Sequence, residues 1–326
     1  MQHMIKKGLK FFGSGVLTLI LMEIMARAFV PACDPPRFVH MTWDVGRGIT
    51  LMKPIEHGRQ WKNTGDFDVS VHIGRYGFRD SKELKSSSDR DFFVVGDSYS
   101  FGWGVEERQR FSNILEKHLG IPFFNIAAPS SDLETYGRLV DYAVENGARI
   151  RNLIIGVCME NDLDLYPERS ETPDKNKPIN NPFMDTQVFK EWLIFHSALY
   201  NFAAATTYHS GLLKKKMIEK TLDENFPNAD VARSSASRIL RLAGDRKLVV
   251  LIIPSRGLWM GNNKKNESEV HETFVRELLA RGLTVVDMKP IFEKIGDPLL
   301  FYFPNDAHWN AKGHIAAADA LLAVLS

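Results

Sequence analysis

An alternation of short apolar runs with longer amphipathic segments, beginning at residue 89, is the feature that most constrains how this chain folds. Short apolar runs are typical of strands buried in a parallel sheet, and the amphipathic segments are typical of the helices that cover it. We expect strands at 92–95, 123–126, 153–157, 248–253 and 284–287, and helices at 111–119, 133–146, 235–243, 270–280 and 312–325. The alternation therefore predicts an α/β fold in which helices cover both faces of a parallel sheet.

The residues before this main domain, which we place at 89–326, have a different pattern. Residues 31–88 contain no long helical pattern. The alternating stretch Asp68–Ile73 indicates a short strand, and Gly74 and Gly77 indicate turns after it. We expect 31–88 to form a small β-rich lead-in that packs on the main domain.

An insertion at residues 163–232 interrupts the main domain. Polar residues and prolines come first, and a helix is expected over Val188–Tyr200. A long insertion of this kind often covers a site or binds a partner.

The N-terminus differs in kind from the rest of the chain. Three lysines precede the uncharged stretch Phe11–Met22, and Glu23 and Arg27 follow it, four residues apart, where they can pair on one helical face. Apolar residues continue to Val30. The segment from residue 11 to residue 30 holds 20 residues, which is about the length that crosses a bilayer.

We interpret residues 1–30 as an uncleaved membrane anchor whose lysines stay in the cytoplasm. The residues that follow would then lie outside that membrane, in the periplasm or at the cell surface. A cleaved signal peptide, an interfacial helix and a buried N-terminal helix are the alternatives, and Val30–Cys33 faintly resembles a lipoprotein cleavage site.

Composition argues against several functional classes. The net charge of +1 is not that of a general nucleic-acid-binding protein. The two cysteines, Cys33 and Cys158, give neither a disulfide framework nor a metal cluster. The sequence also holds no phosphate-binding loop and no haem motif. We therefore expect no cofactor, no metal and no nucleic-acid partner.

Polar residues gather where the expected strands end, and ligands of open parallel sheets bind outside those strand ends. Ser98 follows the first strand, Ser130 the second and Asn161 the third, while Asp306 and His308 lie in a late loop. Acyl transfer needs a nucleophile, a base, an acid that orients the base, and donors for the oxyanion. We assign Ser98 as nucleophile, His308 as base and Asp306 as orienting acid, with the N–H groups of Ser98 and Ser130 and the amide of Asn161 as oxyanion donors.

Simpler roles compete with these assignments. Ser98 is also a plausible helix N-cap, and Asp97 is expected to bond N–H groups of its loop. His314 is the other histidine near the C-terminus, but we expect it to begin the last helix. Trp103 and Trp309 either stack on sugar rings or pack against the rim of the sheet.

Three ordered blocks of this chain resemble the SGNH (GDSL-type) hydrolases. Gly96-Asp97-Ser98 is similar to the nucleophile block, Asn161-Asp162 to the block that supplies an oxyanion donor, and Asp306 with His308 to the block that supplies acid and base. The resemblance covers roughly residues 90–326 without the insertion. It implies a three-layer α/β/α sandwich with a flavodoxin-like parallel sheet, and serine esterase or O-acyltransferase activity.

The chain departs from the family pattern at three places. Ser130 stands where the second block normally offers a glycine N–H, and Met159 stands where a glycine usually precedes Asn161 by two residues. One residue separates Asp306 from His308, where many members have two.

The Asp-x-His form followed by Trp309, together with an N-terminal anchor, is similar to the SGNH domains of membrane-anchored bacterial polysaccharide O-acetyltransferases of the alginate type. This likeness implies acyl chemistry on an O-acetyl group of a cell-surface or exported glycan. The alternative is a catalytically degenerate, membrane-anchored glycan-binding or assembly protein.

Overall fold

The computed structural model of this protein describes residues 2–30, 33, 39, 41–62, 64–166, 186–209, 228–260 and 262–325. The first residues of the expected lead-in and most of the expected insertion lie outside the described residues. The bounds of the elements below apply to the described ranges.

A five-stranded parallel sheet forms the centre of the main domain. Its strands are β5 (Phe92–Val95), β6 (Phe123–Asn125), β7 (Asn152–Cys158), β8 (Lys247–Ile253) and β9 (Thr284–Asp287). They lie in the order β6-β5-β7-β8-β9, and each neighbouring pair is parallel. Counted within this sheet, the order is 2-1-3-4-5, the flavodoxin-like order. The order reverses at β5, between β6 and β7, and this switch point is where such sheets bind ligands.

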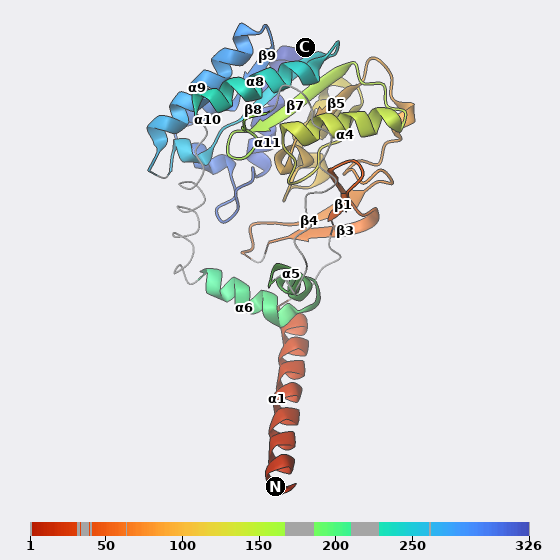
Figure 1. Ribbon diagram of the computed structural model, residues 1–326, viewed down its shortest axis with the longest axis vertical. Coiled ribbons are helices and arrows are strands. Elements are labelled where there is room, and N and C mark those ends of the chain that lie inside the picture. Colours follow the sequence, from red (N-terminus) through yellow and green to blue (C-terminus); the bar gives the residue numbers. More distant parts are fainter. Residues whose placement is uncertain are drawn as a thin grey trace.

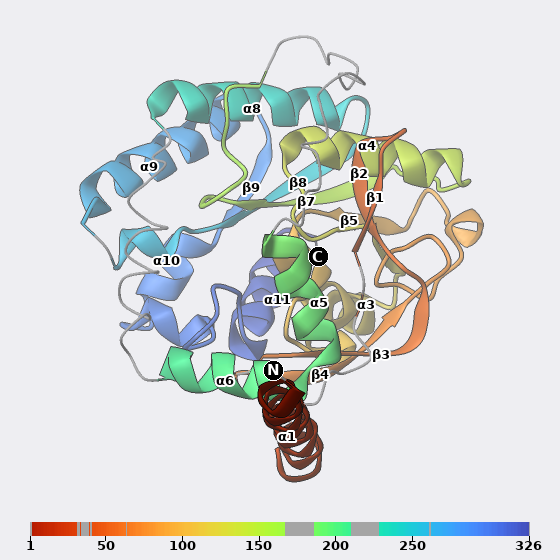
Figure 2. The same cartoon turned by 60° about the horizontal axis from the view of Figure 1, so that its bottom comes forward.

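Helices cover both faces of the sheet, which confirms the predicted three-layer α/β/α sandwich (Figure 2). One face carries α4 (Leu133–Glu145), α8 (Ala229–Ala243) and α9 (Lys264–Ala280). The other carries α3 (Phe111–Leu119), α10 (Met288–Glu293) and α11 (Ala311–Leu325). Side chains of β5 alternate between these two layers, since Phe93 and Val95 pack with the first and Val94 with the second.

Two helices begin earlier than the apolar pattern indicates. We expected α8 to start at Ser235, but it starts at Ala229, because the Asn228 side chain accepts the N–H groups of Asp230 and Val231 and so caps the helix. Helix α9 starts at Lys264 and not at Val270. The additional residues of α9 are all polar and those of α8 are half polar, so an apolar pattern is weak or missing there.

The predicted single helix at Val188–Tyr200 is wrong. The chain forms two helices there, α5 (Thr186–His196) and α6 (Ala198–His209), which are separated at Ser197. The Ser197 Oγ accepts the N–H of Tyr200 and so caps the start of α6.

The lead-in is β-rich, as predicted. It contains two antiparallel hairpins, β1 (Met41–Asp44) with β2 (Ile49–Met52) and β3 (Ile55–Trp61) with β4 (Asp68–Ile73). Ile49 is buried in the same cluster as α4, and Val71 and Ile73 are buried against Phe101 of the main domain. The lead-in therefore shares its core with the domain that it precedes.

Helix α1 (Gln2–Phe29) extends away from the rest of the chain as a rod, with α5 and α6 at its base (Figure 1). Within the described residues it is the helix long and apolar enough to cross a membrane, over Phe11–Phe29, and nearly all of that stretch is exposed. It packs on α6 near its C-terminal end. A buried N-terminal helix is therefore excluded, while an anchor and a signal sequence both fit this length and composition.

Candidate active site

The turn after β5 positions Ser98 at the start of the short helix α2 (Ser98–Phe101). Asp97 caps this helix, because its Oδ1 accepts the N–H of Tyr99 at 3.0 Å. The prediction that Asp97 bonds its own loop is confirmed. The alternative role of Ser98 as N-cap is excluded, and its side chain at the first helical position is partly exposed.

Two glycines, one directly after β5 and one within the adjacent strand β7, allow this turn to be tight. A Cβ at Gly96 would lie 2.2 Å from the Ser100 Oγ and 3.0 Å from the carbonyl oxygen of Gly156. A Cβ at Gly156 would also lie 2.2 Å from the Ser100 Oγ. Any larger residue at either position would push Ser100 away and move the turn that carries Ser98.

The side chains of Ser98, His308 and Asp306 form a continuous chain of hydrogen bonds. The His308 Nε2 lies 2.8 Å from the Ser98 Oγ, and its Nδ1 is hydrogen-bonded to the Asp306 Oδ1. Because a carboxylate only accepts, the Nδ1 carries the proton and the Nε2 is free to accept the proton of the hydroxyl. The Asp306 Oδ1 also accepts the backbone N–H of His308 at 3.0 Å, which fixes the carboxylate relative to the ring.

Asp306 is an ionised carboxylate with a cation on its far side. Burial alone would raise the pKa of Asp306, but the hydrogen bond from His308 and the charges of His308 and Lys62 outweigh it and hold that pKa well below its usual value. The Lys62 Nζ lies 2.9 Å from the Asp306 Oδ2. Lys62 directly follows β3 of the lead-in, and no sequence motif pointed to it.

Aromatic side chains surround the His308 ring. The Trp103 ring stacks on it at 5.6 Å, centroid to centroid, with an angle of 29° between the ring planes. The Tyr99 hydroxyl donates to the carbonyl oxygen of Ala307 at 2.6 Å. Trp309 is fully buried, with its ring edge-on to that of Tyr99. Trp309 therefore packs in the core, whereas Trp103 faces the histidine.

The expected oxyanion donors come from three adjacent strands. Ser98 follows β5, Ser130 follows the neighbour β6, and Asn161 follows the other neighbour β7. The Ser98 N–H is at the first helical position, where it has no partner within the helix. The Asn161 Nδ2 lies 3.5 Å from the Asp97 Oδ2, at the edge of hydrogen-bond reach, so Asn161 is next to the turn of the nucleophile.

Ser130 has an unusual backbone conformation. Its φ of 59° lies in the left-handed region, and it is the non-glycine residue with positive φ in the described part of the chain. Serine rarely adopts this conformation without a local cost. This conformation is typical of glycine, the residue that the family pattern normally has at the block to which we assign Ser130.

Two further carboxyl groups are buried beneath the site. The Asp162 Oδ2 accepts the Tyr136 hydroxyl and the backbone N–H of Cys158, both at 2.7 Å. Burial raises the pKa of both Asp97 and Asp162, and the proximity of the two acids raises that of Asp162 further. These groups hold the turns after β5 and β7 together and are not exposed to a substrate.

His314 is not placed to act as the base. It is buried between α11 and α3, where its Nδ1 accepts the N–H of Phe111. Burial, together with the nearby charges of Arg110 and Arg79, lowers the pKa of His314 to about 3, so it stays neutral.

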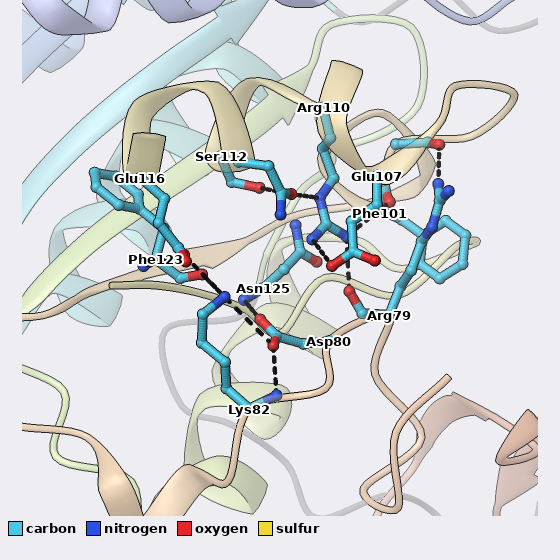
Figure 3. A network of polar contacts seen from close by, with 12 residues as sticks. Arg79, Asp80, Lys82, Phe101, Glu107, Arg110, Ser112, Glu116, Phe123 and Asn125 are labelled. Atoms are coloured by element: carbon cyan, nitrogen blue, oxygen red, sulfur yellow. Dashed lines mark hydrogen bonds and ion pairs between the residues drawn. The ribbon is translucent and has the colours of Figure 1, made fainter. Parts of the chain in front are cut away.

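Two buried arginines brace the loop that follows the nucleophile helix (Figure 3). The Arg79 guanidinium donates to the carbonyl oxygens of Gly102 and Val105, and the Arg110 Nη1 donates to the carbonyl oxygen of Arg79 at 2.7 Å. Asp80 accepts the N–H of Asn125 in β6 at 2.8 Å. The lead-in thus connects the loop after Ser98 to the edge strand of the sheet.

The described residues offer no grouping of three or more His, Cys, Asp or Glu side chains that could hold a metal ion. The side chains that meet at the end of β5 supply a hydroxyl, an imidazole and a carboxylate, with N–H donors nearby. These are the groups that nucleophilic acyl transfer uses.

One family model matches the C-terminal third of this chain. Residues 221–326 match the family model described as ALGX, the SGNH hydrolase-like domain of the acetyltransferase AlgX. This range includes Asp306 and His308 and begins after Ser98. No curated protein matches the chain.

Several solved structures align with most of the chain at low identity. A member of the lipolytic protein G-D-S-L family from Veillonella parvula DSM 2008 aligns at 12% identity and a TM-score of 0.43, over 72% of this chain and 97% of that one. A lipase/acylhydrolase from Enterococcus faecalis aligns at 11% and 0.44, over 72% and 95%. A carbohydrate esterase family 2 enzyme with a carbohydrate-binding domain from Corynascus thermopiles (Myceliophthora fergusii) aligns at 11% and 0.39, over 73% and 66%.

The family match covers the C-terminal third of the chain, which contains Asp306 and His308. The motifs that resemble the SGNH hydrolases also include Ser98 and Asn161, which lie before the matched residues. The resemblance to the SGNH hydrolases is thereby confirmed, and the C-terminal part of this chain is similar to the SGNH hydrolase-like domain of the acetyltransferase AlgX family.

Proposed function

We propose that this chain is an SGNH-type serine esterase or O-acyltransferase that works through an acyl-enzyme on Ser98. The observation that carries the proposal is the 2.8 Å contact between the Ser98 Oγ and the His308 Nε2, with Asp306 on the opposite nitrogen of the same ring. A nucleophile, a base and an orienting acid in this sequence of contacts are what covalent acyl transfer requires.

The reaction has two steps. The Ser98 Oγ attacks the ester carbonyl carbon while the His308 Nε2 takes the hydroxyl proton, and the tetrahedral intermediate then breaks the carbon–oxygen bond to the alcohol. His308 returns the proton to that leaving oxygen, and the acyl group stays on Ser98. Water or an acceptor hydroxyl then attacks the acyl-enzyme, giving its proton to His308, and Ser98 leaves with that proton.

Asp306 and the N–H donors stabilise charge during these steps. Asp306 stabilises the imidazolium that forms when His308 is protonated, and Lys62 keeps Asp306 ionised. The N–H groups of Ser98 and Ser130 and the Asn161 amide stabilise the oxyanion. Removing one such donor typically slows turnover by about 10²–10³-fold.

The substrate we propose is an O-acetyl ester of a cell-surface or exported glycan. The similarity of residues 221–326 to an acetyltransferase family supports acetyl as the acyl group. The apolar helix α1 supports an anchored protein whose remaining residues lie outside the cytoplasm. The proposed partners are thus an acylated small molecule or glycan as substrate, and the membrane through α1.

Turnover of p-nitrophenyl acetate tests the proposal. We expect the full-length protein to release nitrophenol and the Ser98→Ala variant to release none above background, while Ser81→Ala, at an exposed serine of the lead-in, retains full activity. An oligosaccharide acceptor separates the two forms of the enzyme. Acetylated oligosaccharide without free acetate identifies a transferase, and free acetate with or without the acceptor identifies a hydrolase.

The competing candidate is a degenerate glycan-binding or assembly protein. The positive φ of Ser130 supports this candidate, because backbone strain at Ser130 can displace its N–H group, which is one of the expected oxyanion donors. Oligosaccharide binding by a folded protein that shows no turnover would support this candidate and contradict the enzyme.

A further inference from the structure

The charge-free part of α1 is too short to cross a membrane by itself. Phe11–Met22 holds 12 residues, or about 18 Å of helix, against about 30 Å of hydrocarbon. The apolar stretch that is long enough runs to Phe29 and includes Glu23 and Arg27. If it spans the membrane, Glu23 lies about 9 Å before the end of the span. A charge at that depth needs partners.

Helix α6 supplies those partners. The Glu23 carboxylate accepts the Ser197 hydroxyl at 2.9 Å and the N–H groups of Ala198 at 2.8 Å and Leu199 at 2.9 Å. These N–H groups begin α6, where the helix dipole also favours a negative charge. Arg27 donates to Glu23 and to the carbonyl oxygen of His196, the last residue of α5. The two charges of the span are therefore hydrogen-bonded at the junction of α5 and α6.

These contacts set the level of α5 and α6 along α1. Because Ala198 is bonded to Glu23, the start of α6 lies at the depth of Glu23 and not beyond the end of the apolar stretch. Ala26, one turn further along, is buried in the contact between α1 and α6. An apolar groove of about 280 Å³ lies beside it, lined by residues of both helices that include Met25, Phe29, Leu199 and Phe202.

Large apolar side chains of α5 and α6 are exposed at this level. Phe189 and Trp192 stack on each other on α5, and Phe202 is exposed on α6. Trp192 also stacks on His196, the residue bonded to Arg27. Tryptophan and tyrosine are enriched where a membrane meets water, because their rings are amphipathic. Phe202 also lines the groove beside α1, so the exposed apolar surface of α1 continues onto α6.

We propose that α5 and α6 form a platform embedded in the outer interface of the membrane that α1 spans, with Trp192 and Phe202 in contact with phospholipid. The groove between α1 and α6 takes a lipid acyl chain. This inference rests on the proposed anchoring by α1. It places α5 and α6, which belong to the insertion, at the membrane surface, because Glu23 and Arg27 connect them to the membrane-spanning helix.

Quenching of tryptophan emission by brominated lipid tests the platform. The chain has six tryptophans and α1 has none, so lipid in contact with the span alone quenches nothing. The full-length protein is reconstituted in phosphatidylcholine vesicles with plain or dibrominated acyl chains. We expect brominated chains to quench part of the emission and Trp192→Phe to lose most of that quenching.

Matched variants control for other sources of contact. Trp43, on β1, is 61% exposed, compared with 53% for Trp192. Trp43→Phe therefore removes an exposed tryptophan that is not part of the platform, and we expect this variant to keep the wild-type quenching. Phe202→Trp, made in the Trp192→Phe background, is expected to restore quenching from α6.

Several results would overturn the platform. Protein that floats with the vesicles but shows no quenching would place Trp192 away from lipid, and loss of quenching in Trp43→Phe would place β1 on the membrane instead. Trp192 shielded by a second copy, detected as a cross-linked dimer with no quenching, would replace lipid by protein. Protein that does not float contradicts the anchor, whereas loss of p-nitrophenyl acetate turnover in floating, quenched protein contradicts only the enzyme.

Discussion

His308 and His271 each hydrogen-bond to an aspartate, but the two pairs lie in different regions and have different second partners. His308 bonds Asp306 through its Nδ1 and Ser98 through its Nε2. His271, on α9, bonds Asp287 at the end of β9 through its Nε2 at 2.9 Å. Its Nδ1 is buried and has no hydrogen-bond partner within the described residues.

This difference shows what turns a His–Asp pair into a candidate catalytic centre. Asp287 already caps α10 by accepting the N–H of Lys289, so the His271 pair fastens a helix to a strand. In the Asp306–His308 pair, the histidine is instead hydrogen-bonded to the Ser98 hydroxyl. This hydroxyl lies at the switch point of the sheet, where a substrate can reach it. A His–Asp contact alone therefore carries no function.

Replacing the two histidines should give the largest contrast. We expect His308→Ala to lower kcat for p-nitrophenyl acetate by about 10⁴-fold or more, because it removes the base of the proposed mechanism. His271→Ala should leave kcat unchanged. Equal losses in both variants, measured on protein with a native circular dichroism spectrum, would remove the distinction between the pairs.

Asp306→Asn should come next in size. The amide keeps the shape of the carboxylate but is neutral, and its NH2 group can donate a hydrogen bond to the His308 Nδ1. It therefore favours the wrong tautomer of His308. We expect kcat to fall by about 10⁴-fold with little change in KM. Asp287→Asn provides the matched change at the other pair and should not affect turnover. A full-rate Asp306→Asn enzyme would show that the acid has no orienting role.

Asn161→Ala should have an intermediate effect. Loss of one oxyanion donor is expected to lower kcat by about 10²–10³-fold and to leave the reactivity of Ser98 toward a fluorophosphonate measurable. By contrast, Ser130→Gly keeps the N–H and relieves the positive φ, so it should keep or raise activity. A Ser130→Gly variant as impaired as Asn161→Ala would show that the serine side chain itself is needed.

Lys62→Met should have the smallest effect on turnover and a distinct pH signature. The pKa of Asp306 is lower in the folded protein than in the unfolded chain. The resulting stability is therefore fully present above about pH 3.9 and is lost as the pH falls through the folded pKa. Without Lys62 that pKa rises, so acid unfolding should begin at higher pH than in the wild type. Identical acid-unfolding midpoints would contradict the role of Lys62, and Lys53→Met, outside the site, is the control.

Most of the fold could be predicted because each strand and helix has its own apolar pattern in the sequence. The apolar run Phe92–Val95 and the run at 284–287 have the bounds that their patterns indicate. Ser98 could be placed because it directly follows β5, and ligands of such sheets bind at the strand ends. Asp306 and His308 lie well beyond the end of β9, and it was their likeness to the last SGNH block that paired them with Ser98.

The features that sequence reasoning missed depend on contacts between distant segments. Lys62 meets Asp306 only because the lead-in docks on a loop near the C-terminus. The break at Ser197 is stabilised by Glu23, which bonds its hydroxyl from 174 residues away in the sequence. Neither position carries a local signal, since a lysine after a strand and a serine inside an apolar helix pattern are common.

Mapping a fluorophosphonate adduct by peptide mass spectrometry tests whether His308 activates Ser98, because the reagent reacts with an activated serine. For the folded, full-length protein we expect an adduct on Ser98 that forms in His271→Ala and is absent in His308→Ala. No adduct on Ser98, or one that forms equally well without His308, would contradict it.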